Sequence, residues 1–432
     1  MKIIRRNAPD YQEQIKTFKS SRKSFNRELE DRIFPIIEAV KNEGDEALVR
    51  FALQFDHAEM TKQQMEIPSA EVAAAKSAVN PELLTAMSKA IENVKSFTQQ
   101  RIPQDWTYNP RPGVTLGEKF TPLDSVGCYV PGGTAPLVST AVHTVEMASA
   151  SGVKHIYVTT PPSKDRYVNP ALIHAAHTCG AERIFRLGGV YGVAALAFGT
   201  ETVPKVDKIV GPGNAYVAAA KRLLYGQVAI DMVAGPSEIM IIADKTANPA
   251  FVAADLLSQA EHGSGLEQAV LVTTDDALID KVAEQIEIQR AKLSRSECVA
   301  KVLQNGVYLV GASDICEAYS LCSDYAPEHV EVQTENPEEV AKGIRAAGAI
   351  FLGSWTPEPV GDYVAGPSHV LPTSGTAHFF NGLSTDTFFR RSSIIKYDKD
   401  ALLRELPYIR TLALSEGLDA HANSAAIRGS QE

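Results

Sequence analysis

The stretch EIMIIADKTANPAFVAADLLSQAEHGSGLEQAVLVTT, residues 238–274, decides the fold. It begins and ends with continuous apolar runs, which are typical of strands buried on both faces of a parallel sheet. Between them, Asn248 and Pro249 form a helix start signal, and apolar residues recur at helical spacing up to the stop signal Gly263. The stretch therefore predicts a strand, a helix over about 251–263, and a second strand.

The same alternation of strands and helices continues on both sides of this unit. The strand-like runs are GVTLGEKF (113–120), SVGCYV (125–130), VKHIYVTT (153–160), RIFRLGG (183–189), VDKIVG (206–211), AIDMVA (229–234), VYLV (307–310), HVEVQ (329–333) and AIFLG (349–353). Strands that alternate with helices predict an α/β fold with parallel sheets. Because residues 120–375 are too many for one small sheet, we expect two Rossmann-like units, over 113–235 and 236–375.

The two ends of the chain have a different pattern. Residues 1–112 read as a helical N-terminal region, with Pro35 as a kink in one helix. RIPQDWTYNPRPG (101–113) is too rich in proline for regular structure and is predicted to be a connector. Residues 376–432 predict a helical tail that lies outside the sheets.

Composition limits the class of protein. The chain has 432 residues with a net charge of −10, which argues against a nucleic-acid partner. No apolar run is as long as a membrane span, and the N-terminus lacks the apolar middle of a signal peptide. The five cysteines are scattered without a CxxC pair, which fits a reducing compartment. We therefore expect a cytoplasmic protein with no membrane partner.

Three glycine turns each follow a predicted strand and open a helix. They lie at residues 131–133 (Pro-Gly-Gly), 188–189 (Gly-Gly) and 211–214 (Gly-Pro-Gly-Asn). Glycine there lets backbone N–H groups approach an anion or a nucleotide, although tight turns of this kind also occur without a ligand. Neither GxGxxG nor GxxxxGK is present, so the sequence supports neither a standard Rossmann fingerprint nor a P-loop.

Polar residues that could carry chemistry stand at several helix and strand ends. Asp255, Gln259 and His262 share one face of the helix predicted over 251–263, although a histidine in a last helical turn often meets only solvent. Glu328 and His329 stand directly before a strand and could act as bases near neutral pH. Neighbours on a strand point to opposite faces, so both reach one substrate only if the turn is irregular.

Seven segments, in order and at matching separations, resemble those of histidinol dehydrogenase. They are YVPGGTAPL (129–137), AALAFGTETVPKVDKIVGPGNAYV (194–217), DMVAGPSE (231–238), DLLSQAEHG (255–263), PEHVEV (327–332), GDYVAGPSHVLPT (361–373) and SEGLDAH (415–421). The resemblance covers nearly the whole chain. It implies oxidation of L-histidinol to L-histidine through the bound aldehyde, with two NAD and one zinc ion per site.

The resemblance also implies roles for individual residues. The implied zinc ligands are Gln259, His262, Asp362 and His421. Two imidazoles and two oxygens suit zinc and leave room for a substrate. The implied catalytic pair is His329, which takes the alcohol proton, and Glu328, which activates water.

Further contacts follow from the same resemblance. The implied substrate-binding residues are Ser237, Gln259, His262, His329, Asp362, Glu416 and His421. The implied cofactor-contacting residues are Tyr129, Tyr191 and Asn214. The family forms homodimers in which the tail supplies its glutamate and histidine to the partner's site, so we expect a homodimer with shared active sites.

Two features depart from the family pattern. Tyr191 stands where the family usually has a glutamine that contacts NAD, and the stretch 378–391 is unusual. A paralogue similar to sulfopropanediol dehydrogenase would keep zinc and the Glu-His pair but change the substrate contacts, although Glu416 argues against an anionic sulfonate there. A zinc-binding protein without catalysis is a further alternative, but it would need neither Glu328 nor His329. The sequence does not decide between NAD and NADP.

Overall fold

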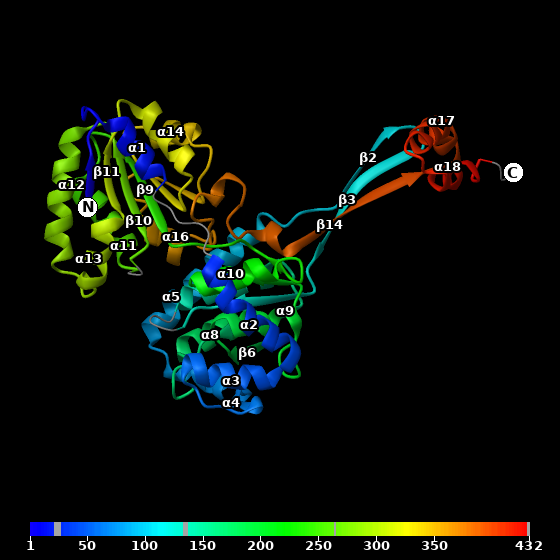
Figure 1. Cartoon of the computed structure of the whole chain (residues 1–432), viewed down its shortest axis with the longest axis horizontal. Coiled ribbons are helices and arrows are strands. Elements are labelled where there is room, and N and C mark those ends of the chain that lie inside the picture. The colour runs from blue at the N-terminus through cyan, green and yellow to red at the C-terminus, as the bar shows by residue number, and fades with distance from the viewer. Residues whose placement is uncertain (21–26, 133–136, 263–264, 430–432) are drawn as a thin grey trace.

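The computed structural model describes residues 1–20, 27–132, 137–262 and 265–429, which form two α/β lobes and one long arm (Figure 1). The first lobe contains a five-stranded parallel sheet with the order β6-β5-β4-β7-β8. Its strands are β4 (Ser125–Tyr129), β5 (His155–Thr160), β6 (Arg183–Arg186), β7 (Lys208–Val210) and β8 (Ala229–Ile230).

The second lobe contains a six-stranded parallel sheet with the order β1-β11-β10-β9-β12-β13. Its strands are β1 (Lys2–Ile4), β9 (Glu238–Ala243), β10 (Gln268–Thr273), β11 (Val307–Gly311), β12 (His329–Gln333) and β13 (Ala349–Leu352). If β1 is set aside, each sheet runs 3-2-1-4-5 in its own chain order, which is the Rossmann order 3-2-1-4-5-6 without its sixth strand. The α/β class with two Rossmann-like sheets is therefore confirmed.

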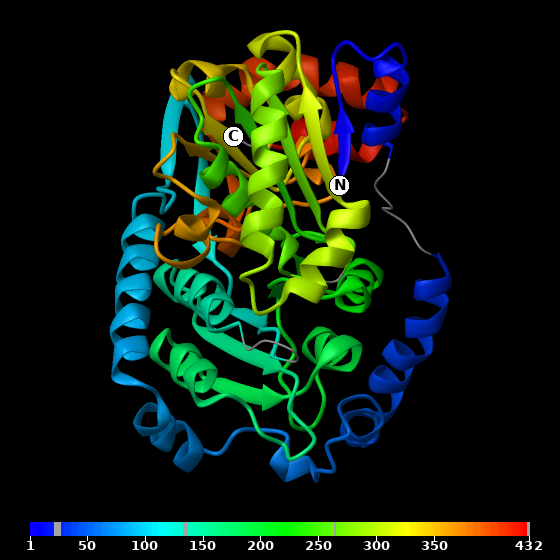
Figure 2. The ribbon, with the colours of Figure 1, turned by 90° about the vertical axis from the view of Figure 1, so that its left-hand side faces the viewer.

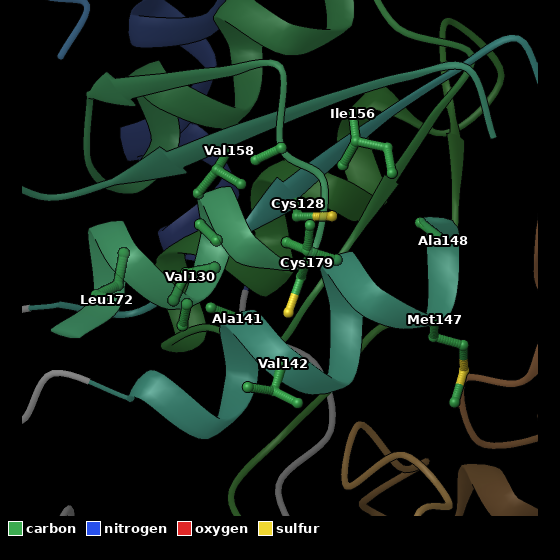
Figure 3. Packing of buried hydrophobic residues seen from close by; sticks show 14 of the residues in the cluster. Cys128, Val130, Ala141, Val142, Met147, Ala148, Ile156, Val158, Leu172 and Cys179 are labelled. Atoms are coloured by element: carbon green, nitrogen blue, oxygen red, sulfur yellow. The ribbon is translucent and has the colours of Figure 1, made fainter. Parts of the chain in front are cut away.

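Helices cover both faces of the first sheet. One face packs against α5 (Pro81–Gln99), α6 (Val138–Ala141), a π-helical segment (Val142–Glu146), α7 (Met147–Ala150) and α8 (Pro170–Thr178). Figure 3 shows this core, in which Cys128 and Val130 lie close to Val142 and Cys179. The other face packs against α2 (Arg27–Glu43), α3 (Asp45–Asp56), α9 (Gly189–Phe198) and α10 (Ala215–Leu224).

The second sheet is covered in the same way (Figure 2). One face packs against α11 (Pro249–Ala260), α12 (Asp276–Arg290) and α13 (Ser296–Asn305). The other face packs against α1 (Tyr11–Lys19), α14 (Ile315–Tyr325) and α15 (Pro337–Gly343). Among the described helices, none combines the length and the apolar composition that crossing a lipid bilayer requires.

The helix that was predicted over 251–263 is α11. Its start signal works as expected, because the Asn248 side chain accepts a hydrogen bond from Ala250 N at 2.9 Å and Pro249 is the first helical residue. The predicted stop, Gly263, lies outside the described residues, as does Gly133 of the first glycine turn.

The arm consists of three antiparallel strands with two helices at their far end (Figure 1). The strands are β2 (Trp106–Arg111), β3 (Val114–Pro122) and β14 (Phe389–Tyr397), and the helices are α17 (Lys399–Ser415) and α18 (Asp419–Ala426). Asp398 caps α17 by accepting from Ala401 N at 2.8 Å. The C-terminal helices therefore stand away from both lobes, next to the tip of the β3–β14 ribbon.

The arm corrects two expectations and β1 corrects a third. The proline-rich connector 101–113 contains β2, because Pro110 lies on an edge strand where the register shifts and no ladder hydrogen bond is needed from it. The helical tail also contains β14, whose residues are mostly exposed and therefore lack a core-facing pattern. The helical N-terminal region begins with β1, which joins the sheet of the second lobe beside β11.

Candidate functional site

The residues predicted to carry chemistry meet at the amino edge of the second sheet. His329 begins β12 and Glu238 begins the neighbouring parallel strand β9, with His329 in register with Ile239. Helix α11 runs back across the sheet, so Gln259 in its last turn returns to this same edge. The short helix α16 (Glu358–Tyr363) supplies Asp362.

The imidazole of His329 is oriented by its surroundings. Its Nδ1 lies 3.0 Å from the carbonyl oxygen of Glu238, and a carbonyl only accepts hydrogen bonds. The ring proton is therefore on Nδ1, which leaves Nε2 as the unprotonated nitrogen. Nε2 is buried without a hydrogen-bond partner among the described residues and lies 4.0 Å from Asp362 Oδ1. This bare nitrogen is suited to accept a proton.

Glu328 contacts the backbone N–H of the same residue, Glu238. Its Oε2 accepts from Glu238 N at 2.9 Å and lies 3.8 Å from His329 Nδ1. Burial raises the pKa of Glu328 well above its usual range, and the nearby carboxyls of Glu238 and Asp362 act in the same direction. The predicted pair is therefore brought together, with the irregular turn before β12 that the sequence required.

Gln259 and His262 lie together at the end of α11. Gln259 Nε2 is 3.5 Å from His262 Nδ1, and that ring nitrogen is 3.2 Å from the backbone carbonyl of Gln259. Gln259 is fully buried, and its Oε1 has no hydrogen-bond partner in the described part of the chain. A buried amide oxygen without a donor needs a ligand or an ion to offset its desolvation.

Asp362 and Glu358 complete this cluster from α16. One ligating atom each of His329, Glu358 and Asp362 lies within 4.8 Å of the others. Burial raises the pKa of Asp362 to about 6, helped by Glu358 and opposed by His329 and His262. Glu358 is also buried, and its Oε1 lacks a partner among the described residues.

These donors fit a divalent metal ion. Gln259 and Glu358 each carry a buried oxygen without a partner among the described residues, and the Asp362 carboxyl interacts electrostatically with His262 and His329. Oxygen with imidazole is a common donor set for zinc. His421, the fourth predicted ligand, is exposed on α18 at the tip of the arm. Of the predicted ligands, Gln259 and His262 therefore lie together on α11 and Asp362 lies on α16 of the same lobe, while His421 stands apart.

A buried polar network stands behind the site. Gln333 Nε2 donates to Asp255 Oδ2 at 2.8 Å and to Glu331 Oε2 at 2.9 Å, while Glu331 Oε1 accepts from Glu358 N at 2.7 Å. Asp255, on the same face of α11 as Gln259, thus turns away from the cluster. The network links α11, β12 and α16, the three elements that carry the site residues.

The first lobe contributes its carboxyl edge, where the glycine turns lie. Asn214 caps α10 by accepting from Tyr216 N at 3.0 Å and from Val217 N at 3.1 Å. At Gly211, which has a φ of +114°, a β-carbon would lie 2.2 Å from the carbonyl oxygen of Tyr129. Only glycine therefore lets the turn 211–214 pass the end of β4.

A buried ion pair holds this turn. Asp231 Oδ2 accepts from Gly211 N at 2.8 Å, and Lys221 Nζ donates to the Gly211 carbonyl at 2.9 Å. Lys221 and Asp231 also contact each other, with side chains that are 2% and 1% exposed. Both backbone polar groups of Gly211 are thus fixed by one pair.

Tyr129 and Tyr191 meet at the turn 188–189. The Tyr129 hydroxyl accepts from Gly189 N at 3.2 Å. Tyr191 is 1% exposed, packs against Phe51 and Phe55 of α3, and donates its hydroxyl proton to Asp56. The ring of Tyr191 therefore belongs to the core of the first lobe, with its hydroxyl at the turn.

His369 connects the amino edge of the second sheet to the first lobe. Its Nε2 lies 3.1 Å from Thr140 Oγ1 of α6, and its Nδ1 lies 3.1 Å from the backbone carbonyl of Asp362. Its ring stacks on the fully buried His143 of the π-helical segment at 4.5 Å. Burial lowers the pKa of His369 to about 4, so this stacked pair is neutral at ordinary pH.

The remaining predicted residues lie apart. Ser237 is half-buried directly before β9, next to Glu238. Glu416 is exposed at the end of α17 and stands with His421 on the arm, away from α11 and α16 in Figure 1. Sequence reasoning missed Glu358, His369 and Asp56. Glu358 could have been found from its spacing of four residues before Asp362, which places both on one helix face.

Comparisons with known proteins agree over the full length. The family model described as histidinol dehydrogenase matches residues 19–429. The chain is 44% identical to "Histidinol dehydrogenase" of Clostridium acetobutylicum, with 99% of each chain covered, and 43% identical to that of Listeria monocytogenes, with 100% of each covered.

A solved structure gives the same result. The crystal structure of histidinol dehydrogenase from Elizabethkingia anophelis superposes with a TM-score of 0.94 at 36% identity, covering 99% of this chain and 98% of that one. Fold, full-length match and identity agree, and the chain belongs to the histidinol dehydrogenase family.

Proposed function

We propose that the protein oxidises L-histidinol to L-histidine through L-histidinal, using zinc and two NAD, in the last steps of histidine biosynthesis. The observation that carries the proposal is the placement of Glu328 and the bare Nε2 of His329 beside the carboxyls of Glu358 and Asp362. A metal site with a purely structural role would need neither Glu328 nor His329.

Zinc, when bound, would hold and orient the imidazole and amine of the substrate. The residues that would hold it are Gln259, His262, Asp362 and His421, with His421 coming from a second chain. Ser237 and Glu416 are the proposed further substrate contacts, and a carboxylate is a suitable partner for an ammonium group. Tyr129, Tyr191 and Asn214 are the proposed cofactor-side residues at the turns 188–189 and 211–214.

The chain's own residues account for the proton transfers. His329 Nε2 takes the proton of the alcohol while hydride leaves its carbon, and Nδ1–H stays on the Glu238 carbonyl. The Glu328 carboxylate, whose pKa burial raises well above its usual range, takes a proton from the water that adds to the aldehyde. After His329 has released the first proton to solvent, the hydrated aldehyde passes a second hydride to a second NAD, with His329 again as proton acceptor.

A homodimer with shared sites is part of the proposal. The supporting observation is that the arm carries Glu416 and His421 away from the cluster while exposing apolar side chains at its tip, among them Tyr408 at 70% and Leu412 at 65%. The lobe that carries the cluster also exposes Trp355 at 86%. Large apolar side chains left uncovered on both surfaces are typical of an interface.

The test is NADH formation by purified protein with L-histidinol, beside a panel of other amino alcohols and diols. Two NADH per histidinol, with L-histidine as product, is the expected result. Faster oxidation of another amino alcohol or of a diol would instead indicate that the protein is a paralogue with the same fold and a different substrate.

A further inference from the structure

Asp56, the last residue of α3, places its carboxylate against the turn that opens α9. Tyr191 donates its hydroxyl proton to Asp56 Oδ2. A β-carbon at residue 188 would lie 2.9 Å from Asp56 Oδ2 and 3.1 Å from Oδ1, so the carboxylate contacts the backbone of Gly188. Asp56 is half-buried, and neither the zinc site nor the proton transfers use it.

The position of this carboxylate in the sheet is informative. In a dinucleotide-binding unit, an acidic residue after the second strand hydrogen-bonds the 2′-hydroxyl of the adenosine ribose. The second strand of the first lobe is β5, and it is followed by Pro161 and Pro162 rather than by an acid. Asp56 comes from outside the sheet to this place, because Pro161 and Asp56 both lie against Gly188.

The carboxylate also changes what the turn 188–189 can bind. The N-terminus of a helix attracts anions, and this turn would otherwise be one of three places for a phosphate. Here Gly189 N donates to the Tyr129 hydroxyl, and the Asp56 carboxylate brings negative charge to the same helix end. A phosphate at this turn would meet a like charge in a partly buried setting.

We propose that Asp56 selects NAD over NADP, by accepting a hydrogen bond from the ribose 2′-hydroxyl and by repelling a 2′-phosphate. The inference rests on the proposed function, which supplies the dinucleotide. Tyr191 is a positioning residue, since its buried ring fixes the hydroxyl that holds the carboxylate. The tyrosine that departs from the family pattern thereby gains a role in cofactor choice.

The experiment measures NAD and NADP binding to the zinc-loaded, full-length protein by calorimetry, which needs no turnover. The wild type should bind NAD at least tenfold more tightly than NADP. Asp56→Asn keeps the size of the side chain and removes its negative charge. It should therefore lower the ratio of the NADP to the NAD dissociation constant at least tenfold, mainly through tighter NADP binding. Tyr191→Phe should narrow it less, and Asp56→Glu should keep it because the charge is retained.

Glu59→Gln is the matched control, because it removes an exposed negative charge three residues further on and should leave the ratio within twofold. An Asp56→Asn ratio within twofold of the wild type, in folded protein that still binds NAD, overturns the inference alone. If Glu59→Gln narrows the ratio as much as Asp56→Asn, general charge rather than this contact is responsible, and the inference is also overturned. Failure of the wild type to bind either dinucleotide overturns the inference and the proposed cofactor together.

Discussion

Glu328 and His329 hydrogen-bond to the two backbone groups of a single residue: Glu238 N donates to Glu328 Oε2 at 2.9 Å, and the Glu238 carbonyl accepts from His329 Nδ1 at 3.0 Å. The first residue of strand β9 therefore fixes the position of the Glu328 carboxyl and the tautomer of the His329 imidazole. Two groups with different tasks can act on one substrate because neither has to move to find its partner.

Separate substitutions should divide the two oxidations. His329→Asn should slow the oxidation of histidinol by about 10²–10⁴-fold, because the alcohol keeps its proton. Glu328→Gln should spare this step and slow the oxidation of added L-histidinal, so that aldehyde accumulates when histidinol is the substrate. The measurement is NADH and trapped aldehyde per histidinol consumed. Wild-type protein that stops at one NADH with free aldehyde would contradict the assignment.

Metal content should depend on the buried oxygens. Purified protein should contain one zinc per chain, chelation should abolish activity, and added zinc should restore it. Gln259→Leu and Asp362→Asn should each weaken zinc retention at least tenfold, because the first removes a buried oxygen donor and the second removes the negative charge of a carboxylate ligand. Glu284→Gln, an exposed position on α12, is the control and should keep its zinc. Active protein without a divalent ion by elemental analysis would refute the site.

Subunit exchange should reveal shared sites. A chain with His421→Ala and a chain with His329→Asn should each be inactive alone. In a heterodimer with shared sites, both lesions fall in one site and the other site is intact, so activity should return to roughly half of the heterodimer's sites. A mixture that exchanges subunits, as shown by mass spectrometry of differently tagged chains, yet stays inactive would rule out sharing.

Glu146 should make stability depend on pH. Burial raises the pKa of Glu146 to about 7 in the folded protein, while Lys95 and Cys179 lower it in part. The folded chain therefore holds a proton that the unfolded chain releases above its ordinary pKa near 4.5. Glu146 thus favours the folded state less and less as pH rises from about 4.5 to 7. Glu146→Gln should flatten this decline in melting temperature, with Glu92→Gln, an exposed position on α5, as the control.

Breaking the buried ion pair should disturb the turn 211–214. Lys221→Met leaves Asp231 buried without its cation, which should cost about 3–5 kcal/mol of unfolding free energy. Because Gly211 also loses its carbonyl partner, NAD binding should weaken. The measurements are denaturant unfolding and NAD titration at a temperature where the variant is folded. An unchanged unfolding free energy and an unchanged NAD affinity would show that the turn keeps its conformation without the ion pair.

The strands of the two sheets could be predicted because burial on both faces makes each one a continuous apolar run. β9, with Ile239 to Ala243 fully buried, is the clearest case. β2 and β14 gave no such signal, since all six residues of β2 are exposed and β14 pairs along an arm without a core. An arm of this kind is set by backbone pairing, which leaves no hydrophobic period.

The site was predictable in part for a similar reason. Local spacing brought Gln259 and His262 to one helix end, but nothing local placed Glu238 against Glu328 and His329, since that contact joins segments 90 residues apart. Asp56 was missed because its partner Tyr191 lies 135 residues away. Through-space partners of this kind are visible only once the sheets have assembled.

The arm has a consequence for the order in which the enzyme is made. β3 lies early in the chain and β14 late, so the ribbon that carries α17 and α18 closes only after most of the chain has been synthesised. If the proposed shared site is right, a newly released subunit would hold three of the proposed zinc ligands and would lack His421 until it meets another copy. Metal loading would then follow association, so that a lone subunit matures slowly at low expression and zinc uptake shows second-order kinetics in protein concentration.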